Sequence, residues 1–80
     1  MSRTEIAEIL QAWFVENRGT RIDPQDDFIE SGQMDSFDML TLVAFCEQAF
    51  GISFSASDLE SDRFVTLAGL TELIAAHLPG

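Results

Sequence analysis

The chain has 80 residues, with 14 Asp and Glu against four Arg and a formal net charge of −10. This length suffices for one small domain of about three or four short helices but not for a deep catalytic cleft, so it favours a binding or carrier module over an enzyme. The charge would repel nucleic acid and anionic lipid, so we expect neither as a partner, and protein partners should present basic patches; acidity that merely keeps the protein soluble is the plain alternative.

The single cysteine and the single histidine limit the chemistry further. Cys46 alone excludes an internal disulfide, and with His77 far along the chain there is no Cys/His cluster with metal-ligand spacing, so we predict no metal site. No apolar run approaches the roughly 20 residues that span a bilayer. Glu5 and Glu8 stand where a signal peptide would be apolar, so we expect a cytoplasmic protein.

The first predicted element is a helix over residues 4–16. Ser2 and Glu5 match the capping-box pattern of a helix N-terminus. Five apolar residues then follow the i, i+3, i+4, i+7, i+8 spacing that lines one helix face: Ile6, Ile9, Leu10, Trp13 and Phe14.

A long loop follows, up to residue 35. Four residues that interrupt regular structure mark it: Asn17, Gly19, Pro24 and Gly32. We expect Ile22, Phe28 and Ile29 to pin the loop to the core. A loop of this length in a small domain is typical of a functional segment, so we look for the site at its far end.

Residues 36–50 predict the second and most regular helix, because they are rich in apolar side chains, lack Gly and Pro, and precede Gly51, a typical helix stop. The residues predicted to face inward are Leu40, Val43, Cys46, Ala49 and Phe50, with Met39 and Leu42 on the flank. Those predicted to face outward are Phe37, Thr41, Ala44 and Gln48. Cys46 is therefore expected to be a small core residue and not a reactive thiol.

The next segment predicts a connector and a short helix. Ile52 and Phe54 alternate with serines but have no partner strand, which favours an extended connector. Ser57 and Glu60 match a second capping box, which predicts a short helix to about residue 62.

The chain closes with a last predicted helix. Thr66 is its expected N-cap and Pro79–Gly80 its end, and His77 is expected to be solvent-facing. Its apolar face comprises Leu67, Leu70, Leu73, Ile74 and Leu78. The predicted fold is therefore all-α, with three main helices, one short helix and a long loop between the first two.

One segment combines a loop end, a helix start, acidic side chains and a serine: Gly32-Gln33-Met34-Asp35-Ser36-Phe37-Asp38. Taken alone, Asp35 or Ser36 is most simply the N-cap of the helix, since both residue types are favoured caps and acidic groups suit the positive end of the helix dipole. By itself the segment indicates a helix start, not a function.

The whole-chain pattern is more specific. Asp35-Ser36-Phe37-Asp38 at the start of the second of four helices, after a long acidic loop in a small acidic chain, resembles the acyl carrier protein family. The resemblance covers nearly the full length and implies a four-helix bundle of acyl-carrier type, with residues 1–80 as one carrier domain that is not an enzyme.

The resemblance also implies a site. Ser36 would receive a 4′-phosphopantetheine arm from coenzyme A, and Asp35 would serve recognition by the phosphopantetheinyl transferase and its magnesium. The arm, and not Cys46, supplies the thiol that holds an acyl or aminoacyl cargo as a thioester. A phosphodiester suits the N-terminus of a helix, although Asp35 and Asp38 partly oppose it.

The motif departs from the fatty-acid type of the family, in which Gly commonly stands two residues before the Asp, Leu follows the serine and acidic residues line the second helix. Here Gly32 stands three residues before Asp35, Phe37 follows the serine, and Thr41 and Gln48 replace frequent Glu residues. The spacing is similar to D-alanyl carriers and freestanding carriers of nonribosomal peptide or polyketide pathways. It implies a carrier served by a separate adenylating or acyl-loading enzyme and a downstream acyltransferase or synthase, with the fatty-acid carrier as the alternative. We expect the domain to be a monomer.

By the same resemblance, partner enzymes dock on the second helix and around the short third one. The predicted contact residues are Phe37, Asp38, Thr41, Ala44, Asp62 and Arg63. An exposed Phe37 suits such a contact as an anchor. The alternative is that its ring folds back onto Phe28 or Ile29 and belongs to the core.

Three other classes compete with the carrier. A hydrolase would need Ser36 and His77 in a triad with a carboxylate, together with a pocket and an oxyanion hole. A calcium loop of EF-hand type fails, because placing Gly32 sixth puts Ile29 third, where an oxygen ligand is required. An unmodified acidic helical adaptor keeps the same fold without the arm, so only the modification state separates it from the carrier.

Overall fold

The computed structural model of the protein describes residues 1–78, which form four α-helices and a 3-10 turn. In chain order these are α1 (Arg3–Arg18), α2 (Ser36–Phe50), α3 (Ala56–Leu59), the turn η1 (Asp62–Val65) and α4 (Leu67–His77). No strand occurs within residues 1–78. The all-α prediction is confirmed, whereas the predicted helix end at Pro79–Gly80 lies outside the described residues.

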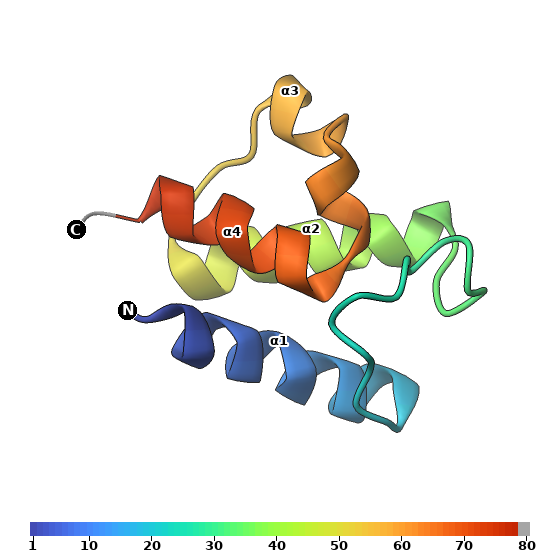
Figure 1. Ribbon diagram of the computed structural model, residues 1–80. Helices are drawn as coiled ribbons and strands as arrows, with labels where there is room; N and C mark the ends of the chain where they lie inside the picture. Colours follow the sequence, from blue (N-terminus) through green and yellow to red (C-terminus); the bar gives the residue numbers. More distant parts are fainter. Residues whose placement is uncertain (79–80) are drawn as a thin grey trace.

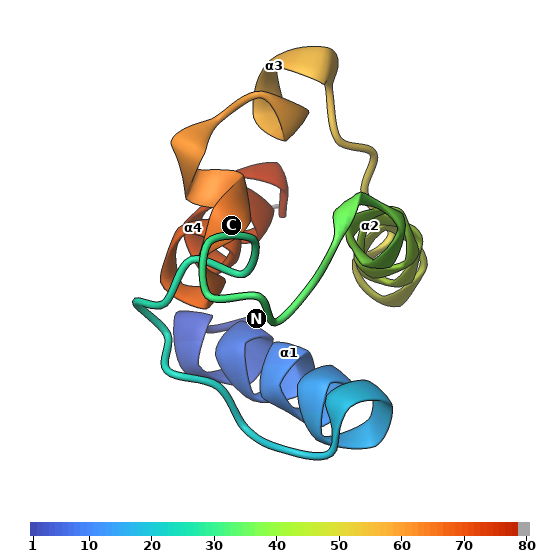
Figure 2. The ribbon, with the colours of Figure 1, turned by 90° about the vertical axis from the view of Figure 1, so that its right-hand side faces the viewer.

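The three long helices surround one core. Helices α2 and α4 run in roughly the same direction and α1 runs against them (Figure 1). Seen along α2, α1 lies below the other two long helices, and α3 with its connectors spans the space above them (Figure 2). The loop between α1 and α2 closes the end of the domain at which α1 finishes and α2 begins.

Helix α1 begins as predicted and ends later than predicted. The Ser2 hydroxyl accepts the backbone N–H of Glu5, and the Glu5 carboxylate accepts the backbone N–H of Ser2, so the capping box is confirmed. The helix continues to Arg18 because Gly19 is the first residue able to adopt the left-handed conformation, φ 82°, that stops it.

The core combines residues from every long helix with residues from the loop. On α1 the predicted apolar face is buried except for Ile9, which is partly buried, and the Phe14 ring packs against Trp13 and Phe28 at centroid distances of 5.0 and 5.1 Å. The remaining buried apolar side chains are Ile6, Leu10, Ile22, Met34, Leu42, Cys46, Phe50, Phe64, Leu67, Leu70, Leu73 and Ile74. The loop is thus part of the core and not an appendage.

Two of the three residues expected to pin the loop do so. Phe28 is fully buried, and the buried side-chain amide of Gln11 makes hydrogen bonds of 2.7 and 2.9 Å with the backbone carbonyl and N–H of Ile22. The prediction for Ile29 is wrong, because this side chain is 43% exposed. The Asp27 carboxylate accepts the backbone N–H of Ile29, and the resulting turn directs Ile29 outward while Phe28 occupies the core.

The short helix α3 corrects a second prediction. Its capping box is formed by Ser55 and Asp58, not by Ser57 and Glu60, so the helix begins and ends earlier than expected and η1 follows as a separate turn. The sequence contains two overlapping capping-box patterns, Ser55 with Asp58 and Ser57 with Glu60. The partly buried Phe54 just before Ser55 selects the first, because it anchors the chain immediately before the helix.

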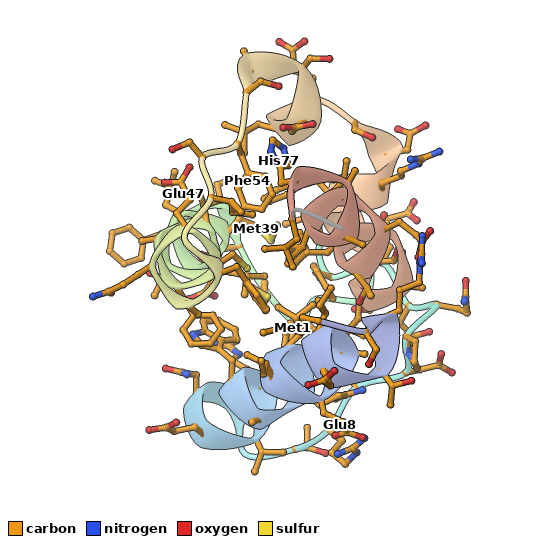
Figure 3. The ribbon with its side chains drawn as sticks, turned by 90° about the vertical axis from the view of Figure 1, so that its left-hand side faces the viewer. Met1, Glu8, Met39, Glu47, Phe54 and His77 are labelled. Carbon is orange, nitrogen blue, oxygen red and sulfur yellow. The ribbon has the colours of Figure 1, made fainter. Side chains whose placement is uncertain are left out.

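Helix α3 has no buried residue and is held by its neighbours. The Phe54 ring packs edge-on against Phe64 and His77, and its backbone N–H donates to Glu47 of α2 (Figure 3). His77 Nε2 lies 2.7 Å from Asp58 Oδ2. The backbone N–H of Ser55 and the His77 side chain together lower the pKa of the Asp58 carboxyl. His77 is exposed as predicted, and in addition it joins α4 to α3.

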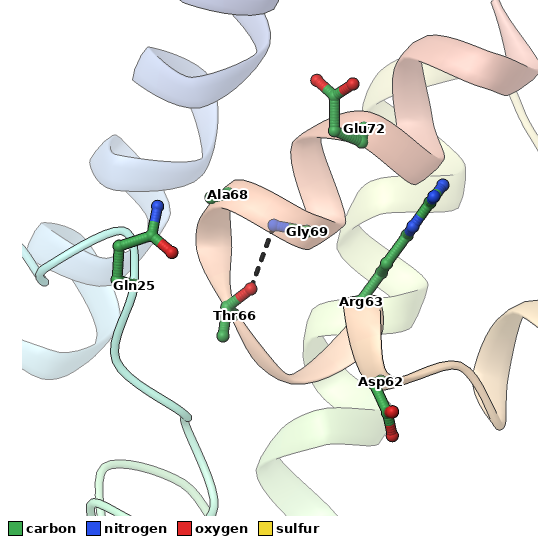
Figure 4. Close-up of a pocket in the computed structure, with 7 residues that line it drawn as sticks. All are labelled: Gln25, Asp62, Arg63, Thr66, Ala68, Gly69 and Glu72. Carbon is green, nitrogen blue, oxygen red and sulfur yellow. Dashed lines mark hydrogen bonds between the residues drawn. The ribbon is translucent and has the colours of Figure 1, made fainter.

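The turn η1 packs directly on α4 at Gly69. The Thr66 hydroxyl accepts the backbone N–H of Gly69 at 3.0 Å, which confirms Thr66 as the N-cap (Figure 4). A Cβ on Gly69 would lie 2.3 Å from the backbone oxygen of Arg63. Only glycine permits this approach.

We expect Gly69→Ala to lower the free energy of unfolding by about 1–3 kcal/mol, because the added methyl group meets a backbone carbonyl that moves only if η1 shifts. This outcome runs against helix propensity, which favours Ala over Gly by about 1 kcal/mol. Urea denaturation measures the change, with Ala12→Gly, at an exposed position inside α1, as the control for propensity alone. A Gly69→Ala protein more stable than wild type would contradict the close packing of η1.

Candidate functional site

Ser36 is the first residue of α2 and is exposed. The helix is capped by Asp35, whose Oδ1 accepts the backbone N–H of Asp38 at 2.8 Å, while Asp38 Oδ2 accepts the backbone N–H of Asp35 at 3.2 Å. This reciprocal capping box defines the turn. Because Asp35 supplies the cap, the Ser36 hydroxyl is not needed for it.

The turn is anchored from the core side by Met34, which is 3% exposed. The Met34 N–H donates to the carbonyl of Phe28 at 2.9 Å, and the Phe28 N–H donates to the carbonyl of Val65 at 2.7 Å. Sequence reasoning missed this anchor. Its signal was present, since Met34 directly before the N-cap and Met39 at the fourth helical position match the hydrophobic-staple pattern.

The outward face of α2 carries no charge. We call it the outer strip, and its residues, all exposed, are Phe37, Leu40, Thr41, Ala44 and Gln48. Phe37 is 75% exposed, so the interpretation that its ring folds back onto the loop is wrong. The outer strip presents two large apolar side chains, Phe37 and Leu40, next to Ser36.

The predicted inward face of α2 is wrong at two positions. Leu40 is 67% exposed and Ala49 is exposed, whereas Leu42, predicted on the flank, is fully buried. The residues that reach the core most fully are Leu42, Cys46 and Phe50, at i, i+4 and i+8. The helix is apolar on almost every side, so periodicity alone did not specify its rotation.

Ser36 lies at the margin of an apolar groove of about 280 Å³ between α2 and the α3–η1 segment. Ile29 of the loop contributes to its rim. The walls are formed by Met39, Leu40 and Val43 from α2, Leu59 from α3, and Phe64 and Val65 from η1. A group attached to Ser36 would therefore find apolar surface within reach.

The two predicted contact residues of η1 lie elsewhere. Asp62 and Arg63 are exposed and line a separate hollow of about 390 Å³, together with Gln25 and residues of α4 (Figure 4). Phe64 and Val65 of the same turn line the groove beside Ser36. The turn thus separates Asp62 and Arg63 from the groove.

Cys46 and His77 do not contribute to the Ser36 site. Burial, with a smaller contribution from Glu47, raises the pKa of the Cys46 thiol to about 12, so the thiol is protonated at neutral pH. The end of α4, which carries His77, and the start of α2 lie at opposite ends of the domain, so Ser36 and His77 form no triad (Figure 1).

Two further properties concern the whole described chain. Within residues 1–78 no group of three or more His, Cys, Asp or Glu side chains is arranged to hold a metal ion. No helix in the same range has both the length and the apolar character needed to cross a membrane.

A family model described as "Phosphopantetheine attachment site" matches residues 3–74 of the chain. The matched span runs from the first residue of α1 into α4, so it includes the Asp35–Ser36 turn and the groove beside it. No curated protein matches the chain.

Proposed function

The chain belongs to the phosphopantetheine attachment site family, and on that premise we propose that it is a carrier protein whose 4′-phosphopantetheine arm is attached to Ser36. In this family the arm is a covalently bound prosthetic group. It supplies a thiol on which an acyl or aminoacyl group is held as a thioester. Tethering raises the effective concentration of the cargo at each partner enzyme, and the carrier itself catalyses nothing.

The observation that carries the assignment is the position of Ser36. It is the exposed first residue of a 15-residue helix, at the margin of an apolar groove. Its hydroxyl is accessible to a transferase because Asp35 provides the cap. By contrast, Ser2, Ser55 and Ser61 use their hydroxyls to cap other helices or turns.

The start of α2 suits a phosphodiester. The backbone N–H groups of Ser36 and Phe37 are the first two amides of the helix and have no acceptor within it, and the positive end of the helix dipole favours an anion. The carboxylates of Asp35 and Asp38 oppose the anion, although both are engaged in the capping box. We assign Asp35 to recognition by the phosphopantetheinyl transferase and its magnesium.

The groove favours an acyl cargo with an apolar chain. Its lining would exclude water from such a chain, whereas the charged amino group of an aminoacyl cargo would find no partner among these side chains. We therefore place a specialised acyl cargo, of polyketide type, ahead of nonribosomal peptide or D-alanylation cargo. The fatty-acid carrier is the alternative.

The outer strip of α2 is the proposed docking face for the transferase, the adenylating or acyl-loading enzyme and the downstream acyltransferase or synthase. Phe37, Thr41 and Ala44 lie on it as the sequence predicts, and Leu40 adds a second large apolar contact. Asp38 borders the strip, while Asp62 and Arg63 would contact only a partner that extends across η1. The proposal includes a monomer located in the cytoplasm.

The test is the intact mass of the protein after incubation with coenzyme A, magnesium and a broad-specificity phosphopantetheinyl transferase. We expect wild type to gain one phosphopantetheine and Ser36→Ala to gain none. Ser31→Ala and Ser57→Ala are matched controls, because both serines are exposed and neither is an N-cap, and we expect both variants to gain the arm. Circular dichroism verifies that each variant is folded.

Each other outcome has a distinct meaning. No gain on folded wild type, with a known carrier modified in parallel, would favour the unmodified adaptor. A gain on both wild type and Ser36→Ala would retain the carrier function and refute the assignment of Ser36.

A further inference from the structure

Arg18 connects the end of α1 to the turn that carries Ser36. Its Nη2 donates to the backbone carbonyl of Gln33 at 2.6 Å, and its Nη1 lies 3.5 Å from Oδ2 of Asp38. The same carboxylate oxygen accepts the backbone N–H of Asp35 at 3.2 Å. One guanidinium therefore contacts the chain on both sides of Ser36.

This contact differs from an ordinary surface ion pair. The side chains of Arg18 and Asp38 are 33% and 29% exposed, whereas those of Arg21 and Glu8, which pair elsewhere on the domain, are 60% and 59% exposed. Exposed pairs contribute little, because solvent screens them and both side chains lose freedom. The partly buried Arg18 guanidinium instead donates one charge-assisted hydrogen bond, to the carbonyl of Gln33, and also lies beside the Asp38 carboxylate, so two contacts fix its position.

The geometry matters because half of the capping box depends on the Asp38 carboxylate. Arg18 compensates its negative charge while one of its oxygens stays on the Asp35 N–H. Without Arg18, the carboxylates of Asp35 and Asp38 would lie close together with no cation beside them. Both carboxylates border the place where an anionic phosphate must approach Ser36.

We propose that Arg18 is a positioning residue for the modification of Ser36, acting through Asp38 and Gln33 and not by contact with the serine. This inference rests on the proposed function. In the modification, the bond from Ser36 Oγ to phosphorus forms as the pyrophosphate P–O bond of coenzyme A breaks; 3′,5′-adenosine bisphosphate leaves and the hydroxyl proton passes to the transferase. Arg18 holds the turn in place and offsets the carboxylate charge that the phosphate meets.

The first test is the kcat/KM of a broad-specificity transferase on the unmodified protein. We expect Arg18→Gln to lower it about fivefold to tenfold, the effect of losing roughly one charge-assisted hydrogen bond. Arg18→Lys should recover part of the lost kcat/KM, since lysine keeps the positive charge but lacks the planar guanidinium that can contact Gln33 and Asp38 together. Arg21→Gln removes the same charge from an exposed pair and should change kcat/KM by less than about twofold.

The second test asks whether Arg18 acts through Asp38. On an Asp38→Asn background, Arg18→Gln should lower kcat/KM by a clearly smaller factor than in wild type, because the carboxylate it compensates is gone and only the Gln33 contact is lost, whereas a general loss of stability would have the same effect on both backgrounds. In the unmodified protein, amide hydrogen exchange at Asp35 should be faster in Arg18→Gln than in wild type or Arg21→Gln. This measurement needs no transferase. If Asp38→Asn alone stops modification, so that the kinetic comparison cannot be made, Asp35 exchange still tests whether Arg18 holds the turn.

Equal kcat/KM values for Arg18→Gln and Arg21→Gln, an undiminished Arg18→Gln effect on the Asp38→Asn background, or unchanged Asp35 exchange would overturn the inference. Failure of wild type to gain the arm would instead contradict the proposed function, and Asp35 exchange would still test the role of Arg18 in the turn.

Discussion

Replacing Phe28 with alanine is expected to lower the free energy of unfolding by about 3–5 kcal/mol, through lost burial and a residual cavity. The side chain is fully buried, and its ring packs on Phe14 at 5.1 Å. Its backbone N–H donates to Val65 and its carbonyl accepts from Met34. One loop residue thus joins α1, η1 and the turn before Ser36. In a domain whose total stability is of order 5–15 kcal/mol, this is a large fraction.

Urea denaturation followed by circular dichroism measures the loss. Ile29→Ala is the matched control, because Ile29 is the next residue of the same loop but is 43% exposed, and we expect a change within about 0.5 kcal/mol. Phe28→Leu leaves a smaller cavity and should remain folded, so it tests whether a loosened anchor slows modification of Ser36. Equal losses in Phe28→Ala and Ile29→Ala would contradict the observed packing.

Replacing Phe37 with alanine is expected to lower the kcat/KM of the phosphopantetheinyl transferase about tenfold or more while leaving the free energy of unfolding within about 0.5 kcal/mol of wild type. The ring is 75% exposed on the free domain, so its burial against a partner would contribute about 1.5–3 kcal/mol. Steady-state kinetics by mass spectrometry and urea denaturation provide the two measurements.

The uncharged character of the outer strip sharpens this test. Salt screens attraction between charges but does not weaken apolar contact. The ratio of wild-type to Phe37→Ala kcat/KM should therefore be the same at low salt and at about 0.5 M NaCl, where surface charges are strongly screened. Phe37→Leu should keep most of the activity, and Val15→Ala, which shortens an exposed apolar side chain on α1, should have little effect. Wild-type kcat/KM in folded Phe37→Ala would show that this ring is not an anchor for the transferase.

Local signals in the sequence sufficed for the starts of the long helices, for the end of α2 and for the candidate serine, but not for the end of α1 or the bounds of α3. The capping box of Ser2 and Glu5, the N-cap Thr66 and the bounds of α2 all appear as predicted, because caps and stops act within a few residues of one another. The turn at Asp35 and Ser36 is likewise formed by neighbouring residues, so its start-of-helix character was readable from the chain.

Choices between equivalent local patterns required the tertiary structure. Two overlapping capping boxes were available near α3, and packing of Phe54 against Phe64 and His77 accompanies the one that begins at Ser55. In the same way, Arg18 reaches the Ser36 turn only because the folded loop brings the end of α1 beside the start of α2.

The sequence by itself thus determined an all-α domain with Ser36 at a helix start, since those features depend on short-range hydrogen bonding and apolar spacing, while the carrier role followed from the resemblance of the whole chain to a known family. The tertiary structure alone decided that Leu40 faces outward and that Leu42 is buried. The physical reason is that α2 is apolar on almost every side, so its rotation follows from which side chains fill the space left by α1, α4 and the loop, and no local pattern contains that information.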